Sequence, residues 1–323
     1  MNLYLATQNG VWLAQSSAGS WQLEPRGLNG RNVTSIIARE GVILAGTTDG
    51  IFRSDDEGAS WYEQSNGLTE RHVRWLAFHP DISDLEFAGT EPAAIFVSED
   101  GGESWEERPE VAQLRDQFNW WLPYSPEAGC VRGFAFHGQH VFAAVEVGGL
   151  LCSDDGGGSW QLAEGSDGQP KFGQPAAGQI HPDVHSIEVH PSSHHLLFAP
   201  TGGGFYASGN GGGSWRPLYA NCYVRAVWLH PENSQELVLG VAEGPSGRNG
   251  RIEHSTDGGQ TWQPLTEPQP HNMVERFVQA GSQLFAVMSS GDLWHSPLPN
   301  QAWIEIFPPA TKIQAACWMD HKI

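Results

Sequence analysis

The chain has 323 residues, of which 37 are acidic and only 17 are lysine or arginine, so its formal net charge is −20. A surface this acidic is repelled by nucleic acid and by anionic membranes, which excludes both as partners. No apolar run approaches the 18 residues of a transmembrane helix, and the N-terminus has no basic segment followed by an apolar one. We expect a soluble, cytoplasmic protein.

Short strands separated by turns are expected from the first residues onward. Three strands come first: Leu3–Thr7, Val11–Gln15 and Trp21–Glu24. After Trp61 four strands follow one another: His72–His79, Leu85–Gly89, Ala94–Ser98 and Ser104–Glu107. The first strands of the other groups are rich in β-branched and aromatic residues: Val33–Ala38, Val131–His137, Val184–His190, Val224–His230 and Met273–Gln279.

One motif, S-x-D-x-G-x-x-W, recurs before the last strand of each group. Each copy ends at a tryptophan. The seven tryptophans lie 40, 44, 55, 55, 47 and 41 residues apart: Trp21, Trp61, Trp105, Trp160, Trp215, Trp262 and Trp303. The first and last copies keep the length and the tryptophan but lack the aspartate and the glycine of the motif. A period of about 40–45 residues with four strands in each unit is typical of a β-propeller. The sequence therefore predicts an all-β, seven-bladed β-propeller of four-stranded antiparallel blades.

The acidic position of each motif is predicted to serve the turn and to have no part in catalysis or metal binding. Its side-chain oxygens can accept hydrogen bonds from nearby backbone N–H groups, the glycine can take a positive φ, and the tryptophan can fill space between blades. Asparagine offers the same acceptor oxygen. The residues concerned are Asp56, Asp100, Asp155, Asn210 and Asp257.

The first group has three strands and lacks the innermost one. The segment Lys312–Met319 has the pattern of a first strand. We expect it to complete the N-terminal blade, which would then comprise residues 1–25 and 311–320, within a single propeller domain spanning 1–323.

The long steps between tryptophans contain insertions. Two follow a fourth strand, at Glu107–Cys130 and Leu162–Pro182, and a shorter one, Glu243–Arg251, replaces a turn between strands two and three. All three should lie at the end of the propeller opposite the Asp-containing turns, where long loops on a rigid scaffold often carry function. The first insertion holds an aromatic cluster that could stack on a ligand, anchor a partner, or form a satellite core: Phe118, Trp120, Trp121, Pro123 and Tyr124.

One register position in each first strand should lie near the axis at the elaborated end. It follows the first apolar residue of the strand and is occupied by Thr34, Arg74, Arg132, His185, Arg225, Glu275 and Gln314. The turns between strands two and three add acidic residues there: Asp49, Glu91, Glu146 and Glu243. The three arginines could gather on a carboxylate or phosphate, or each could pair with a glutamate to line a water-filled channel. Glu91 and Glu146 could also flank a glycosidic bond.

The run His181-Pro-Asp-Val-His185 is a second candidate centre. On a strand Asp183 and His185 point the same way, so they could hold a metal with a third ligand from elsewhere. They could instead form an acid–base pair, with Tyr223 as a second proton carrier, or His185 could be a hydrogen-bonded residue at the channel rim. Three other His-Pro pairs end first strands and are predicted to be turns: His79-Pro80, His190-Pro191 and His230-Pro231.

The four cysteines fall in four different repeats and form no C-x-x-C pair: Cys130, Cys152, Cys222 and Cys317. This suits reduced, mostly buried thiols better than disulfides or a zinc site. We expect a monomer without a cofactor.

The recurring motif resembles the Asp-box, or BNR, repeat over essentially the whole chain. That resemblance implies a superfamily that includes sialidases, xyloglucanases, sortilin-type receptors and a photosystem assembly factor, which is not specific for activity. Four further stretches resemble a bacterial branch labelled glycosyl hydrolase without a defined reaction: Gly89–Pro92, Glu146–Gly149, Asp183–His185 and Tyr223–Arg225. The chain departs from sialidases in having seven repeats instead of six and no Arg-Ile-Pro motif. It is also loosely similar to polysaccharide lyases that use His, Tyr and Arg around a uronate.

Three functions follow as hypotheses. The first is binding of a small anionic or saccharide-like ligand at the elaborated end, through Arg74, Arg132, Arg225, Glu243, Glu275, Trp120 and Trp121. A glycosidase- or lyase-type reaction there would use His185, Tyr223, Glu91 and Glu146. The second is a non-enzymatic scaffold that docks a protein partner through Trp120 and Trp121. The third is a metal-dependent enzyme centred on His185.

Overall fold

Seven four-stranded antiparallel sheets form the fold in a computed structural model, which describes residues 1–17, 19–122, 128–171, 173–265, 269–298 and 302–319. This confirms the predicted seven-bladed β-propeller. The chain divides into two compact units: Met1–Ala88 with Phe96–Glu107 and Glu275–Ile323, and Gly89–Ile95 with Arg108–Val274. The single domain over 1–323 stays a prediction. Pro123, Tyr124 and the predicted blade end at residue 320 lie outside the described residues.

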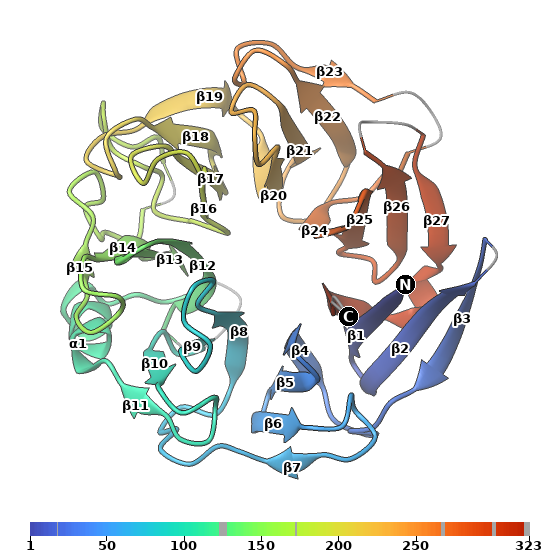
Figure 1. Cartoon of the computed structure of the whole chain (residues 1–323). Coiled ribbons are helices and arrows are strands. Elements are labelled where there is room, and N and C mark those ends of the chain that lie inside the picture. Colours follow the sequence, from blue (N-terminus) through green and yellow to red (C-terminus); the bar gives the residue numbers. More distant parts are fainter. Residues whose placement is uncertain (18, 123–127, 172, 266–268, 299–301, 320–323) are drawn as a thin grey trace. The chain divides into compact units, whose positions relative to one another are not determined.

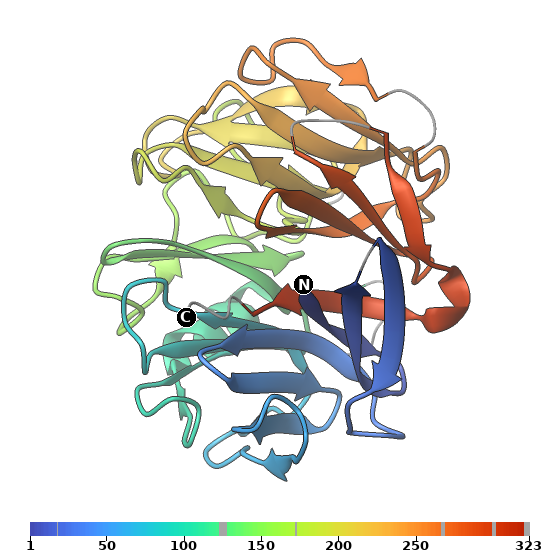
Figure 2. The same ribbon diagram turned by 45° about the vertical axis from the view of Figure 1, so that its right-hand side comes forward.

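The first unit contains the sheet that joins the two ends of the chain. Strand β28 (Ile313–Trp318) pairs antiparallel with β1 (Asn2–Thr7), so that Leu3 faces Trp318 and Leu5 faces Ala316. Figure 2 shows this red C-terminal strand beside the blue N-terminal ones. The sheet continues with β2 (Gly10–Ser17) and β3 (Ser20–Pro25). The predicted completion of the N-terminal blade is confirmed.

Three further sheets contribute to this unit. One consists of β4 (Val33–Arg39), β5 (Val42–Thr47), β6 (Gly50–Ser54) and β7 (Tyr62–Glu63). Another, with residues in both units, consists of β8 (Val73–Phe78), β9 (Glu86–Thr90), β10 (Ile95–Ser98) and β11 (Glu106–Glu107). The last consists of β24 (Val274–Ala280), β25 (Gln283–Met288), β26 (Leu293–Pro297) and β27 (Ile304–Phe307), followed by the 3₁₀ turn η1 (Pro309–Thr311).

The second unit contains three complete sheets, coloured green to orange in Figure 1. The first consists of β12 (Cys130–His137), β13 (His140–Glu146), β14 (Gly149–Ser153) and β15 (Gln161–Leu162). The second consists of β16 (Glu188–Val189), β17 (Leu197–Thr201), β18 (Gly204–Ser208) and β19 (Arg216–Ala220). The third consists of β20 (Tyr223–Leu229), β21 (Leu237–Ala242), β22 (Arg251–Ser255) and β23 (Gln263–Pro264).

One α-helix lies in the first insertion, where sequence reasoning expected only a loop. Helix α1 (Pro109–Phe118) begins with proline at its first turn and ends at Asn119, which adopts the left-handed conformation. The Glu110 carboxylate accepts a hydrogen bond of 2.8 Å from the backbone N–H of Trp160, which ties the helix to the start of β15. Among the described residues no helix is long and apolar enough to cross a membrane.

The Asp-containing turns are built from their own hydrogen bonds, as expected. In the turn after β14, the Ser153 hydroxyl donates to Asp155 Oδ1 at 2.7 Å and accepts from the N–H of Gly157 at 2.8 Å. Asp155 also accepts from the N–H and hydroxyl of Ser159, and these bonds lower the pKa of its carboxyl to about 2. The other turns repeat this pattern at Asp56, Asp100, Asn210 and Asp257.

The tryptophans of these turns fill space between neighbouring sheets. Trp215, which precedes β19, is buried in one apolar cluster with Leu150 and Ala163 of the preceding repeat. Trp262, which precedes β23, similarly has its ring centroid 5.8 Å from that of Phe205 in the preceding sheet. The repeat therefore specifies both a turn and a contact between blades.

Candidate functional site

A cavity of about 630 Å³ lies within the second unit. Among its lining residues are members of two predicted insertions: Gly173, Gln174 and His181 from the second, and Glu243, Gly244 and Pro245 from the third. Val147, Asp183 and Tyr223 also line the cavity, and the last two carry ionisable groups. Two of the insertions that the unequal spacing of the tryptophans indicated therefore contribute to this cavity.

A tight His-Pro turn presents Asp183 to this cavity. The Nδ1 atom of His181 accepts a hydrogen bond of 3.2 Å from the backbone N–H of Asp183. Burial lowers the pKa of the His181 imidazole, which favours its neutral form. The same bond, at 3.2 Å, closes the turns after His79, His190 and His230, which confirms that those His-Pro pairs are turns.

Two glycines leave room for this turn. A Cβ atom on Gly202 would lie 2.1 Å from Asp183 Oδ2, and one on Gly203 would lie 2.3 Å from Cδ2 of His181. A side chain at either position would have to displace the acidic or the imidazole group. The loop between β17 and β18 is therefore shaped to fit the His181–Asp183 turn.

Four of the predicted register positions are the extra residues of β-bulges. In the pairings of β4, β12, β20 and β28 the register shifts by one residue, which leaves one residue without an opposite partner: Thr34, Arg132, Arg225 and Gln314. The fifth blade differs, because Val184 makes only an isolated bridge to Thr201 and β16 is reduced to Glu188–Val189. The chain advances four residues from Val184 to Glu188, whereas the facing stretch of β17 from Phe198 to Thr201 advances only three. This stretch therefore also contains one extra residue. Bulges redirect side chains.

The bulge side chain often reaches the backbone of the next blade. Gln314 donates to the carbonyl of Val33 at 2.8 Å, and Thr34 donates to the carbonyl of Val73. His185 makes the same link, with its Nδ1 atom 2.6 Å from the carbonyl oxygen of Val224. A carbonyl only accepts, so Nδ1 carries the ring proton.

His185 therefore presents a second nitrogen, Nε2, whose surroundings are acidic. Nε2 lies 3.2 Å from Asp183 Oδ2, and the imidazole is completely buried. Neither His185 Nε2 nor Asp183 Oδ1 has a hydrogen-bond partner among the residues that the structure describes, although both atoms are buried. One atom each of Glu146, Asp183 and His185 lies within 4.8 Å of the other two.

The Glu146 carboxylate is held in place by hydrogen bonds from two other side chains. Its Oε2 atom accepts from Arg132 Nη1 and from the thiol of Cys130, both at 3.2 Å, and the carboxylate is 1% exposed. The following residue, Val147, has φ of 67°, which is unusual for a β-branched residue and marks local strain next to the cavity. Arg132 and Glu146, predicted separately for binding and for catalysis, are thus an ion pair.

Tyr223 lies between the cavity and His185. Its ring centroid is 4.6 Å from that of the imidazole, and Arg225 donates to its hydroxyl at 3.4 Å. Burial raises the pKa of Tyr223 to about 12, so its hydroxyl keeps its proton at neutral pH. Tyr223 can therefore donate a hydrogen bond, and its role as a second proton carrier stays a prediction.

The surface role predicted for Trp120 is wrong. Its side chain is fully buried, and the indole N–H donates to the carbonyl of Gly168 at 2.7 Å. Its ring also packs so closely on Gly148 that a Cβ there would lie 2.9 Å away. Trp120 thus belongs to the satellite core that sequence analysis kept as an alternative, and it supports the turn that follows Glu146. Trp121 is 45% exposed.

The remaining predicted residues are more scattered. Glu243 lines the cavity, and one of its carboxylate oxygens lies 3.6 Å from Arg248 Nε. Glu91 is buried in the second unit but is not among the cavity-lining residues described. Arg74 and Glu275 belong to the first unit, and their contribution to a binding site stays a prediction. Asp183 and His181, weighed in the sequence but not placed among the leading site residues, line the cavity; the signal was a His-Pro pair lying outside a strand end.

Comparisons with known proteins support the repeat and the fold. The family model for the BNR/Asp-box repeat matches residues 253–264. No curated protein matches the sequence. The fold is similar to that of an ancestral GH74 enzyme, with a TM-score of 0.62, 18% identity and coverage of 88% of this chain and 38% of the enzyme. This chain therefore spans well under half the length of that protein.

Two other solved structures are also similar. YCF48 bound to D1 peptide has a TM-score of 0.62 and 16% identity, over 92% of this chain and 89% of YCF48. The GH74 xyloglucanase from Xanthomonas campestris has a TM-score of 0.51 and 14% identity, over 93% of this chain and 63% of the enzyme. At these identities the likeness concerns the fold alone.

Proposed function

We propose that the cavity of the second unit binds a neutral, saccharide-like ligand. The observation that carries this proposal is its wall, which includes the acidic residues Asp183 and Glu243 and the aromatic residue Tyr223. Carboxylates accept strong hydrogen bonds from sugar hydroxyls, and an aromatic ring offers an apolar face for the C–H side of a sugar. A volume of about 630 Å³ falls in the range of small-molecule sites.

The charges favour a neutral ligand over the anion that the arginines suggested. None of the described residues that line the cavity is a lysine or arginine. Arg132 is paired with Glu146, and Arg225 contacts Tyr223. An anionic ligand would meet Asp183 and Glu243 without a lining cation to balance them.

The geometry supports binding more directly than hydrolysis. Two-carboxylate hydrolysis requires both groups to reach the scissile bond. Asp183 lines the cavity, but its neighbour Glu146 is 1% exposed and held by Arg132 and Cys130. The fold shared with a xyloglucanase suggests the class of ligand to test and leaves the reaction open.

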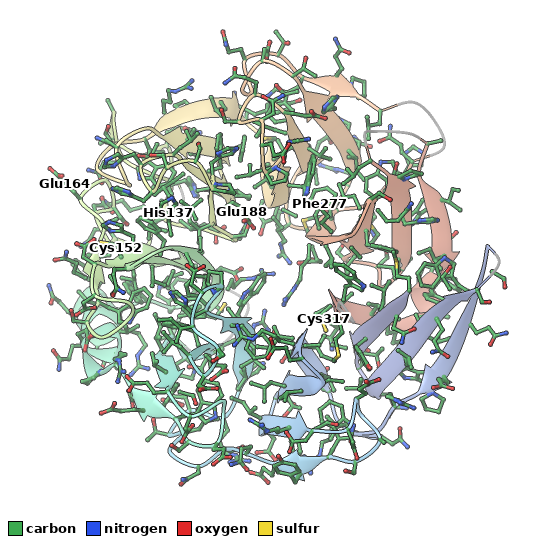
Figure 3. All side chains as sticks on the ribbon, in the orientation of Figure 1. His137, Cys152, Glu164, Glu188, Phe277 and Cys317 are labelled. Carbon is green, nitrogen blue, oxygen red and sulfur yellow. The ribbon has the colours of Figure 1, made fainter. Side chains whose placement is uncertain are left out.

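The test is calorimetric titration with neutral β-glucan oligosaccharides and, in parallel, with oligogalacturonates. We expect the neutral series to bind, and Asp183→Asn and Glu243→Gln to weaken binding by about 10-fold each, since a hydrogen bond to a charged group contributes about 1.5 kcal/mol or more. The matched control is Glu164→Gln, because Glu164 is exposed and lies at the outer margin of the second unit (Figure 3). Tighter binding of oligogalacturonates, or equal affinities in all three variants, would refute the proposal.

A second candidate is docking of a peptide on the first insertion. Trp121 is 45% exposed beside the buried Trp120, and one structure with this fold is described as YCF48 bound to D1 peptide. Tryptophan is a frequent anchor of interfaces. Trp121→Ala is expected to abolish co-purification of a specific peptide-containing partner while leaving thermal stability unchanged, and an unaltered set of co-purifying proteins would contradict this role.

A further inference from the structure

We propose that Glu146, Asp183 and His185 bind a divalent transition-metal ion, with Zn²⁺ as the best match. Asp183 belongs to both proposals, but this inference does not depend on saccharide binding, since the ion needs only these three side chains. An imidazole nitrogen and carboxylate oxygens are common zinc ligands, and three protein ligands leave a further position for water or a ligand. The three ligand atoms lie within 4.8 Å of one another.

The orientation of His185 is the first argument. Its Nδ1–H is donated to the carbonyl of Val224, which fixes the ring with Nε2 toward the carboxylates, 3.2 Å from Asp183 Oδ2. Such a contact is favourable when a proton or a metal ion lies between the two atoms. A metal ion bound to both atoms would take that place.

The unpaired atoms are the second argument. His185 Nε2 and Asp183 Oδ1 are buried without a hydrogen-bond partner in the described parts of the chain, which is costly for groups of this kind. Zinc bonds of about 2.0–2.2 Å place neighbouring ligand atoms roughly 3–4 Å apart. The observed 3.2 Å from Nε2 to Asp183 Oδ2 already fits, and the Glu146 oxygen lies within 4.8 Å of both.

The surrounding contacts are the third argument. Metal-binding histidines usually donate their other N–H to a carbonyl or carboxylate, as His185 does to Val224. Arg132 and Cys130 orient Glu146 in the same way. Asp183 and Tyr223 connect the site to the cavity, which provides a path for the ion.

The chain offers a matched variant for the test. At the same bulge position Gln314 donates to the carbonyl of Val33, so His185→Gln can keep the link to Val224 while removing the imidazole Nε2 ligand. Asp183→Asn is the second variant. Glu243→Gln is the control, because it lies on the cavity wall outside the proposed triad.

A group of histidine rings near the surface could also bind zinc and needs its own control. The ring of His194 lies 4.1 Å from that of His140 and 3.9 Å from that of His195. We therefore include His194→Ala, which breaks up this group without touching the proposed site.

Chelator-treated protein is titrated calorimetrically with ZnCl₂ and, separately, with MnCl₂. We expect one equivalent of Zn²⁺ to bind to the wild type, His194→Ala and Glu243→Gln, with weaker Mn²⁺ binding. His185→Gln and Asp183→Asn should each bind Zn²⁺ more than 100-fold more weakly while melting within a few degrees of the metal-free wild type. Absence of binding to the wild type, loss of binding in His194→Ala alone, or wild-type affinity in both ligand variants would overturn the proposal. Failure of saccharide binding would leave this result unaffected.

Discussion

Glu86 on β9 provides a stability test of the fold that is separate from the candidate site. Its carboxylate is 1% exposed and lies 3.7 Å from Arg39 Nη2, while Oε2 has no hydrogen-bond partner among the described residues. Burial raises the pKa of Glu86 from 4.5 to about 7, and the opposing effect of Arg39 only partly offsets it. The folded protein therefore holds this proton more tightly than the unfolded chain.

The sign of the pH dependence follows from that difference. Below pH 4.5 both states are protonated and stability is full; as pH rises toward 7 the unfolded chain ionises first, so stability falls. Above pH 7 both states are ionised and the loss is constant. A rise in pKa from 4.5 to about 7 corresponds to about 3 kcal/mol.

The perturbation is Glu86→Gln, which removes the charge and keeps the shape. We expect the variant to be more stable than the wild type by up to about 3 kcal/mol at pH 8 and to show little gain at pH 4.5. Arg39 keeps its hydrogen bond of 2.8 Å to the carbonyl of His79 in the variant. Urea unfolding between pH 4.5 and 8 measures the difference, with the exposed Glu232→Gln as control. A gain that is independent of pH, or largest at low pH, would refute the reasoning.

Two more predictions concern turns. Asp155→Ala is expected to reduce the free energy of unfolding by about 1–2 kcal/mol, because its oxygens accept from Ser153 and Ser159, whereas Asp155→Asn should cost less because Asn210 fills the same role. Denaturant unfolding compares them, and equal losses would contradict a role for the acceptor oxygen. Gly202→Ala should weaken both Zn²⁺ and β-glucan binding by more than 10-fold, because the added Cβ would lie 2.1 Å from Asp183 Oδ2. Titration of the folded variant measures this, and unchanged affinities would show that the loop moves aside.

The parts of the fold that repeat were predictable, and the parts that do not repeat were less so. Seven copies of one turn specify the blades, and a missing strand at one end with a spare strand at the other specifies the pairing of β1 with β28. Helix α1 was missed because it occurs once, is 10 residues long and buries only Val111, so periodicity gave no signal. A strand was expected over Val184–His190, but β16 covers only Glu188–Val189. We attribute this to the His181 turn, because the chain enters Val184 directly from that turn.

The sequence predicted which residues occupy equivalent positions near the candidate site, but only part of how they contact one another. Register alignment placed Arg132, His185 and Arg225 at equivalent points, and the bulges at Arg132 and Arg225 explain why those side chains leave the normal alternation. Which charges would pair could not be read from the sequence. Arg132 meets Glu146 because the adjacent Cys130 is paired with Glu146 across β12 and β13, and a bulge of one residue then brings the guanidinium to the same carboxylate.

The residue choices at the bulge position separate what the fold needs from what it does not. A donor to the next blade's carbonyl is enough for the fold, because Thr34 and Gln314 make that link with a hydroxyl and an amide. His185 makes the same link with one nitrogen, and a second nitrogen adds nothing to it. That second atom is buried, has no hydrogen-bond partner among the described residues, and faces Asp183 and Glu146. The proposed metal site accounts for a histidine at this position, because the ion would bind the nitrogen that the structural link leaves unused.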